Sequence, residues 1–222
     1  MLIGDEAVTF RAAAAQDVDA AVPLIYSSGP AAFDYVFGCR RPDEALGFLR
    51  FAFVHRGGEF GYRVHEVATI AGQVVAAGAA FDGKAVLRFA IAGATQILKY
   101  YVPVDAWGVI ARGLRAEAII RPPRAHEHYL CHLGVSPARP SSGIGTRLVR
   151  HLLARIDSSR HRAATLDVSV ENSAAQRLYA RLGFSVTALR ASTLANRDGR
   201  VADHSRMTRP VDAGPAPAVP ST

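Results

Sequence analysis

The chain has 222 residues, enough for one large domain or two small ones. Half of its residues are hydrophobic and only 20% are charged, which excludes a disordered chain. Its net charge is +7, but Lys84 and Lys99 are the only lysines, so arginine carries most of the positive charge. Such a skew is typical of a coding bias and does not identify an anionic partner. The arginines are dispersed and not interleaved with aromatic residues, which disfavours nucleic acid as a partner.

The same composition argues against a membrane or secretory protein. The longest uncharged run, residues 67–81, is shorter than a bilayer span and is divided by a turn at Gly72. The first ten residues contain no basic stretch followed by an apolar one, so no secretory signal is predicted. Two cysteines, Cys39 and Cys131, do not make a disulfide framework. We therefore expect a cytoplasmic location.

The first part of the chain predicts short strands and amphipathic helices. Asp17 stands where a helix N-cap is expected, before apolar residues at helical spacing. Gly29 and Pro30 interrupt that helix, and a second apolar patch follows at 33–37. The predicted elements are a strand at 8–11, a helix after Asp17, a helix from 41 to 54, and a hairpin of strands 62–70 and 73–81.

The second part predicts a more regular alternation. Residues 84–120 are mostly helical in pattern with a break at Pro103, and a rigid linker follows at 121–124. The strand–helix–strand order after it implies parallel pairing with a right-handed crossover. The predicted elements are strands at 128–135, 163–170, 184–189 and 201–207, helices at 143–157 and 172–182, and a hairpin loop at 195–199.

A glycine-rich loop joins the strand at 128–135 to the helix that follows. Gly143 and Gly145 let the backbone approach a ligand closely, and the helix N-terminus presents free N–H groups that suit a phosphate. The Walker pattern is absent, and the third glycine of a dinucleotide fingerprint is replaced by Leu148. A tight turn with an ordinary helix cap is the alternative reading.

Two blocks of sequence resemble the GCN5-related N-acetyltransferases. The acetyl-CoA loop of that family reads Q/R-x-x-G-x-G/A, and here residues 140–145 match it, with Pro140 at the first position and Arg139 one residue earlier. The second family pattern, V-x-x-x-N-x-x-A-x-x-L-Y-x-x-x-G-F, is in register at Val168, Asn172, Ala175, Leu178, Tyr179, Gly183 and Phe184. The resemblance covers 128–189 well and 8–81 by element order.

This resemblance implies an α/β (α+β) fold with a central mixed, mostly antiparallel sheet flanked by helices. Its fourth and fifth strands would run parallel and splay apart. We expect one domain at 1–210 and a disordered Pro/Ala-rich tail at 211–222. Residues 82–125 have no counterpart in the family and would be a helical insertion between the third and fourth strands. That insertion is read either as a lid or apolar acceptor pocket, or as a dimer interface or extra core, so a homodimer is possible.

The resemblance also implies acetyl-CoA as co-substrate, an amine acceptor that is a small molecule or peptide-like, and no metal. Tyr179 would protonate the leaving thiolate, and the Val135 N–H would polarise the thioester carbonyl. The residues expected to bind acetyl-CoA are Leu133, Val135, Arg139, Ser141, Ser142, Gly143, Ile144, Gly145, Thr146, Asn172, Ala175 and Tyr179.

The general base is less sharply indicated. His132 and Glu127 are the candidates on the fourth strand, and Glu171 and Glu66 are more distant alternatives. His126, His128 and His132 would share one face of a regular strand, which raises a metal site, but no further ligand pattern supports it. Because of Pro140 and the open identity of the base, a non-catalytic acyl-CoA-binding module is the alternative function.

Overall fold

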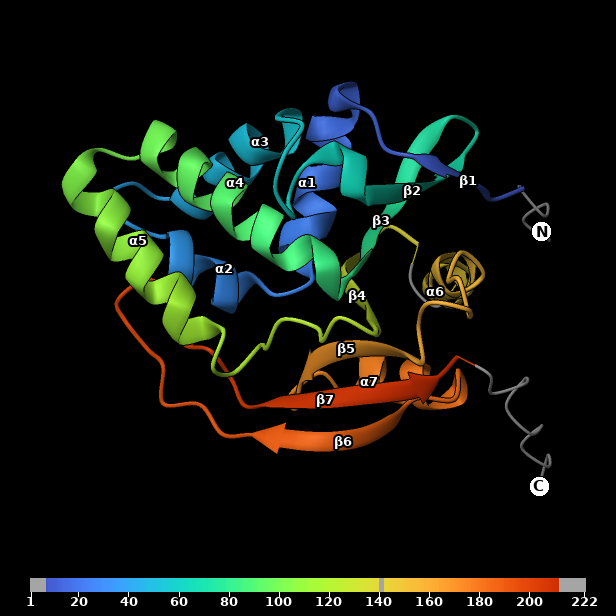
Figure 1. The fold of residues 1–222 in the computed structure, drawn as a ribbon. Coiled ribbons are helices and arrows are strands. Elements are labelled where there is room, and N and C mark those ends of the chain that lie inside the picture. The colour runs from blue at the N-terminus through green and yellow to red at the C-terminus, as the bar shows by residue number, and fades with distance from the viewer. Residues whose placement is uncertain (1–6, 140–141, 212–222) are drawn as a thin grey trace.

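The computed structural model describes residues 7–139 and 142–211 (Figure 1). The predictions for Pro140, Ser141 and the tail from 212 therefore lie outside the described residues. One seven-stranded sheet crosses the molecule in the order β1-β2-β3-β4-β5-β7-β6. Its strands are β1 (Thr9–Ala12), β2 (His65–Ile70), β3 (Gln73–Asp82), β4 (Glu127–Val135), β5 (Ala163–Ser169), β6 (Ser185–Arg190) and β7 (His204–Pro210).

Neighbouring strands pair antiparallel except β4 and β5, which are parallel. The predicted mixed, mostly antiparallel sheet is therefore confirmed. The seven α-helices assigned within the described ranges flank it: α1 (Val18–Ser27), α2 (Pro30–Phe37), α3 (Glu44–Val54), α4 (Val86–Tyr100), α5 (Pro103–Ala116), α6 (Ile144–Leu153) and α7 (Ser173–Arg181). None of these helices is both long and apolar enough to cross a membrane.

The helices cover the two faces of the sheet in separate groups. Successive residues of a strand point to opposite faces. Accordingly, Val67 and Ala77 pack with α1, α2, α3 and α5 in one core cluster, while their neighbours Ala68 and Ala76 pack with α6 in a second cluster. Residues of α7 pack against the second cluster as well. Figure 1 shows α4 and α5 as a helical pair on the same side as α1–α3.

Several predicted boundaries shift for local reasons. The helix predicted to reach Asp157 ends at Leu153, because Arg155 and Ile156 donate to carbonyls three residues earlier and tighten the last turn. The strand predicted from residue 62 begins at His65, after a 3-10 turn at 62–64. The last strand begins at His204 and not at 201, because the Val201 N–H bonds to the Leu194 carbonyl instead of to a sheet neighbour.

The prediction that the Asp17 side chain caps the first helix is wrong. Asp17 precedes α1, but its carboxylate does not cap that helix. The carboxylate accepts two hydrogen bonds of 2.7 Å from the Arg11 guanidinium and one of 2.8 Å from the Ala14 N–H. These bonds hold its pKa below the ordinary value. Asp17 therefore ties the end of β1 to the start of α1.

The segment between β3 and β4 forms two helices, as predicted, with the break before Pro103. Helix α5 buries Ala106, Val109 and Ala116 in the core cluster with α1–α3. The pair also leaves large apolar side chains exposed: Leu87, Ile91, Leu98, Val104, Trp107 and Leu114. The segment is thus extra core on its inner side and an apolar surface on its outer side.

Helix α1 crosses β4 so closely that only glycine fits at residue 134. A Cβ built on Gly134 would lie 1.9 Å from the Leu24 carbonyl oxygen. We expect Gly134→Ala to lower the free energy of unfolding by about 3 kcal/mol or more, because backbone must move. In Gly93→Ala, the new methyl meets nothing within 4 Å inside α4, so stability should rise by up to about 1 kcal/mol. Urea denaturation compares the two variants, and equal stabilities would contradict the packing argument.

Candidate active site

The predicted splay between β4 and β5 is present. The two strands pair only where Glu127–Tyr129 meet Ala163–Thr165. Beyond that point β4 stays paired with β3 as far as Val135, and β5 stays paired with β7 as far as Ser169. The two strands therefore separate toward their carboxyl ends and leave a wedge with one open backbone edge on each side.

A β-bulge reshapes β4 at the start of this wedge. Ala79 pairs with Cys131 and Ala77 with Gly134, so His132 and Leu133 both stand opposite Gly78. His132 takes a left-handed backbone conformation, with φ of 56°, which is costly for a residue with a side chain. Bulges of this kind redirect side chains and end regular pairing. Here the bulge turns the His132 ring toward the α1–α3 side of the sheet, where it contacts His65 and Phe60.

The backbone groups of Val135 point into the wedge. The Ser136 N–H donates to the Val75 carbonyl of β3 at 2.8 Å. Because successive residues of a strand offer their N–H and C=O groups to opposite edges, Val135 presents its own to the β5 side. Leu133, two residues earlier, shares that edge. These two residues were predicted to bind the co-substrate, and the register leaves their polar groups free of β3.

The glycine loop ends at the same place. Gly143 caps α6 in a left-handed conformation with φ of 73°, and the first helical bond runs from the Arg147 N–H to the Gly143 carbonyl. The N–H groups of Ile144, Gly145 and Thr146 therefore have no partner inside the helix. A Cβ on Gly145 would lie 3.4 Å from Leu178 of α7 and 3.5 Å from Val135. The N-terminus of α6 thus meets the end of β4 and the side of α7.

Beside this loop, the Ser142 hydroxyl donates to the Arg139 carbonyl at 2.9 Å. Asn172 is the N-cap of α7, and its side chain accepts from the Ala175 N–H at 3.0 Å. Ala175 packs against the core cluster shared with α6. Together these residues surround the wide end of the wedge on two of its sides.

Tyr179 lies on α7 against the same cluster that Leu133 and Val135 contact. Its ring meets Phe184 edge-on at 6.1 Å. Burial raises the pKa of Tyr179 to about 12, so the phenol keeps its proton at neutral pH. No hydrogen bond to its hydroxyl occurs within residues 7–139 and 142–211. A protonated, uncommitted hydroxyl beside the wedge fits a proton donor.

His132 lies at the wedge but is a poor base. Its Nδ1 is 3.2 Å from the Nε2 of His65, and its ring stacks on Phe60 at 5.1 Å. Burial and the neighbouring His65 hold the pKa of His132 well below its usual range, and burial lowers that of His65 to about 4. Both imidazoles are therefore neutral near pH 7 and accept a proton reluctantly.

The strand histidines do not converge. His128 packs edge-on against His161 at 5.0 Å, while the bulge directs His132 to His65. In the part of the chain that the structure describes, no group of three or more His, Cys, Asp or Glu side chains could hold a metal ion.

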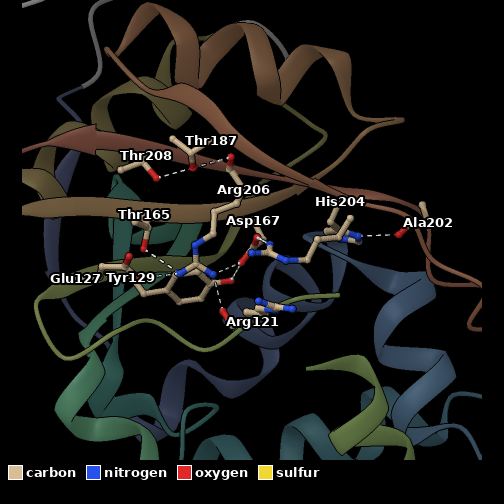
Figure 2. A network of polar contacts seen from close by, with 11 residues as sticks. Arg121, Glu127, Tyr129, Thr165, Asp167, Thr187, Ala202, His204, Arg206 and Thr208 are labelled. Atoms are coloured by element: carbon tan, nitrogen blue, oxygen red, sulfur yellow. Dashed lines mark hydrogen bonds and ion pairs between the residues drawn. The ribbon is translucent and has the colours of Figure 1, made fainter. Parts of the chain in front are cut away.

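Glu127 lies at the paired, narrow end of β4, away from the bulge. Its carboxylate accepts from Arg206 Nη2 at 3.1 Å (Figure 2). It also accepts from the Arg124 N–H at 2.9 Å. Arg206 also bonds Asp167 and the carbonyl of Arg121. The structure therefore gives Glu127 a place in a buried ion-pair network and does not bring it together with Tyr179.

The more distant candidates are not drawn together either. The Glu66 carboxylate lies 3.2 Å from the His151 Nε2 of α6. It also lies 3.3 Å from the guanidinium of Arg155, which follows α6. Glu171 is exposed in the turn after β5.

One acidic residue was missed from the sequence. Glu59 lies in the glycine-rich loop 57–61 between α3 and β2, and its carboxylate is close enough to the Cys131 thiol of β4 to raise the pKa of that thiol. Burial and the carboxylate of Glu117 raise the pKa of Glu59 to about 7. The only sequence signal is a single acid among three glycines and a phenylalanine, a composition typical of a loop after a helix.

The comparisons with known proteins agree with this geometry. Residues 111–184, from within α5 to just past α7, match the acetyltransferase (GNAT) family. A protein of Pseudomonas phage PaMx11 named 5-NmdU N-acetyltransferase is 40% identical over 63 residues, which are 28% of this chain and 43% of that relative. The chain thus spans less than half the length of the curated relative that it matches.

Solved structures match over nearly the whole chain. An N-acetyltransferase from Staphylococcus aureus Mu50 has a TM-score of 0.65 at 17% identity, covering 90% of this chain and 99% of that one. A putative acetyltransferase from Salmonella typhimurium, solved with its cofactor acetyl-CoA, has a TM-score of 0.53 at 18% identity over 96% and 98%. At these identities the likeness establishes the fold. The family match lies in the segment that builds the wedge, so this segment is similar to the acetyltransferase (GNAT) family in sequence, and the whole chain is similar to these structures in fold.

Proposed function

We propose that this protein is an acetyl-CoA-dependent N-acetyltransferase that acetylates a primary amine by direct attack on the thioester. The observation that carries the proposal is the wedge between β4 and β5, closed at its wide end by the N-terminus of α6. An extended thioester arm would bond to the open edge of β4, and its phosphates would meet the free N–H groups of α6.

Two groups of this chain would assist the reaction. The Val135 N–H would donate to the thioester carbonyl oxygen as negative charge develops there. The amine nitrogen forms a bond to the carbonyl carbon, and the carbon–sulfur bond breaks. Tyr179 would give its proton to the departing thiolate and recover one released by the amine. Gly143, Ile144, Gly145 and Thr146 would hold the phosphates with Arg139, Ser141 and Ser142, and Asn172, Ala175 and Leu133 would border the arm.

A non-catalytic acyl-CoA-binding protein is the second candidate. It is favoured by one observation: neither His132 nor Glu127 is placed as an effective base. Thiol release from acetyl-CoA distinguishes the two. We would supply benzylamine, ethanolamine, spermidine and 5-NmdU, the last because of the relative's name. Amine-dependent thiol release supports the enzyme, and binding without release supports the alternative.

Binding of acetyl-CoA is the first expected result. At about 100 times Kd, the ligand should stabilise the protein by about 2.7 kcal/mol, because it binds only the folded state. Urea denaturation with and without acetyl-CoA measures this difference. Gly145→Val is the matched control, since its added carbons would press on Leu178 and Val135 and distort the loop. Absence of stabilisation in the unmodified protein would overturn both candidate functions.

A further inference from the structure

We propose that Glu59 is the general base that accepts the proton of the acceptor amine. This inference rests on the proposed function, because it assigns a role in the same reaction. Glu59 belongs to neither block of sequence that resembles the family, and it lies on the loop between α3 and β2 and not on β4.

The loop that carries Glu59 is fixed on both sides of the residue. On one side, Gln96 of α4 donates from Nε2 to the Gly57 carbonyl at 2.8 Å. Gly58 takes a left-handed conformation with φ of 83°, and the Oε1 of Gln96 lies 2.9 Å from where its Cβ would be. On the other side, the Phe60 ring stacks on His132 at the β4 bulge. Glu59 is therefore held against the strand at the point where the wedge begins.

The Glu59 carboxylate has no cation to balance it. Within residues 7–139 and 142–211 no hydrogen bond or ion pair to it occurs. The partly or fully buried Glu44, Glu66 and Glu127 each have an arginine within 3.3 Å. Glu59 is half-buried, so a ligand can reach its carboxylate, and no described cation competes for that charge.

A second acceptor beside the same loop also lacks a donor. Gln96 is only 5% exposed, and its Oε1 has no hydrogen-bond partner among the described residues. The Glu59 carboxylate and the Gln96 Oε1 thus lie on and beside the same loop, each without a donor among the described residues. The ligand chemistry that such a pair selects is a cationic hydrogen-bond donor, and a protonated amine is one.

The proton balance is complete without any further reactant. The amine arrives as an ammonium ion and gives one proton to the Glu59 carboxylate, which later releases it to water. The neutral nitrogen then attacks the thioester carbon. The tetrahedral adduct loses a second proton as the carbon–nitrogen bond is retained and the carbon–sulfur bond breaks. That second proton replaces the one that Tyr179 gives to the thiolate.

Among the titratable groups around this loop, Glu59 is the one that we expect to ionise near neutral pH. Glu117, the residue that follows α5, repels its negative charge. Cys131 faces it from β4, and burial keeps the pKa of that thiol well above its usual range. His132 of β4 and His65 of β2 have lowered pKa values and are uncharged near pH 7. Activity should therefore rise as pH increases through about 7, where Glu59 ionises.

Glu59→Gln tests the assignment, because it keeps the size of the side chain and removes the base. With benzylamine, ethanolamine, spermidine and 5-NmdU as acceptors, kcat/KM for the best of them is measured from about pH 6 to about pH 9. We expect a loss of about 10²-fold or more above pH 7 and disappearance of the acid limb. Stabilisation by acetyl-CoA should be unchanged.

Two further variants separate catalysis from structure. Glu59→Asp keeps a carboxylate, so it should retain the acid limb with a lower kcat. Glu117→Gln removes the repelling charge, so the acid limb should move to lower pH while the maximal rate is retained. A protein merely weakened by the substitutions would show neither pattern.

The outcomes distinguish this inference from the proposed function. If the unmodified enzyme releases thiol with an amine but Glu59→Gln keeps its rate and its acid limb, Glu59 is not the base and the proposed function stands. If the unmodified protein is not stabilised by acetyl-CoA, the proposed function fails and this inference fails with it.

Discussion

Tyr179→Phe is expected to lower kcat by about 10³-fold and to leave acetyl-CoA binding unchanged. The substitution removes only the hydroxyl, and the ring keeps its contact with Phe184 and the cluster around α6. The hydroxyl is the one group of Tyr179 that can protonate a thiolate. Its pKa of about 12 makes it a neutral donor throughout the pH range in which the amine is attacked.

Thiol release and acetyl-CoA stabilisation are measured on the same protein samples. The matched control is Tyr100→Phe, since the Tyr100 hydroxyl lies over Gly47 between α3 and α4, away from the wedge. That control should keep full activity. Loss of acetyl-CoA binding in Tyr179→Phe would show that the hydroxyl holds the ligand and does not transfer a proton. An unchanged kcat would remove Tyr179 from the mechanism.

Asp167→Ala is expected to lower the free energy of unfolding by about 3–5 kcal/mol. The Asp167 side chain is 1% exposed and accepts from Arg206 at 3.1 Å, from Arg190 at 3.2 Å and from the Tyr129 hydroxyl at 3.1 Å (Figure 2). Burial raises the pKa of Asp167 even beside these two guanidinium groups. Removing the carboxylate leaves part of the buried arginine charge uncompensated, which is the costly case.

The network joins β4, β5, β6 and β7 just at the end where β4 and β5 are still paired. Asp19→Ala is the control, because its carboxylate pairs with Arg50 at the surface and is 85% exposed. That pair should contribute at most about 1 kcal/mol. Denaturation in urea compares the two variants. Similar losses in both would show that the buried network adds nothing to stability.

The order and type of most elements could be predicted from the sequence. Helix α7 has its cap at Asn172 and its stop at Gly183, both of which are local signals. The break before Pro103 has the same origin. The cap predicted for Asp17 is wrong because Arg11, six residues away, offers a stronger partner than the helix backbone. Local rules do not include such competitors.

Part of the candidate site could also be predicted. The glycine loop, Asn172 and Tyr179 are encoded by short motifs in which each residue needs only its near neighbours. The general base could not be predicted, because the position of His132 on its strand does not show that its imidazole is buried. The bulge and the contact with His65 make it a weak base, and His65 lies 67 residues away.

The sequence by itself therefore determined the family-like motifs, the element order and the local caps of this protein. Tertiary structure alone decided which of these acidic groups form an ion pair with an arginine and which do not. Glu127 and Glu59 look alike as single residues, but Arg206 of β7 reaches one and no described cation reaches the other. The ionisation of a carboxylate depends on desolvation and on charges brought close by folding. Neither can be predicted from the residues next to it in the sequence.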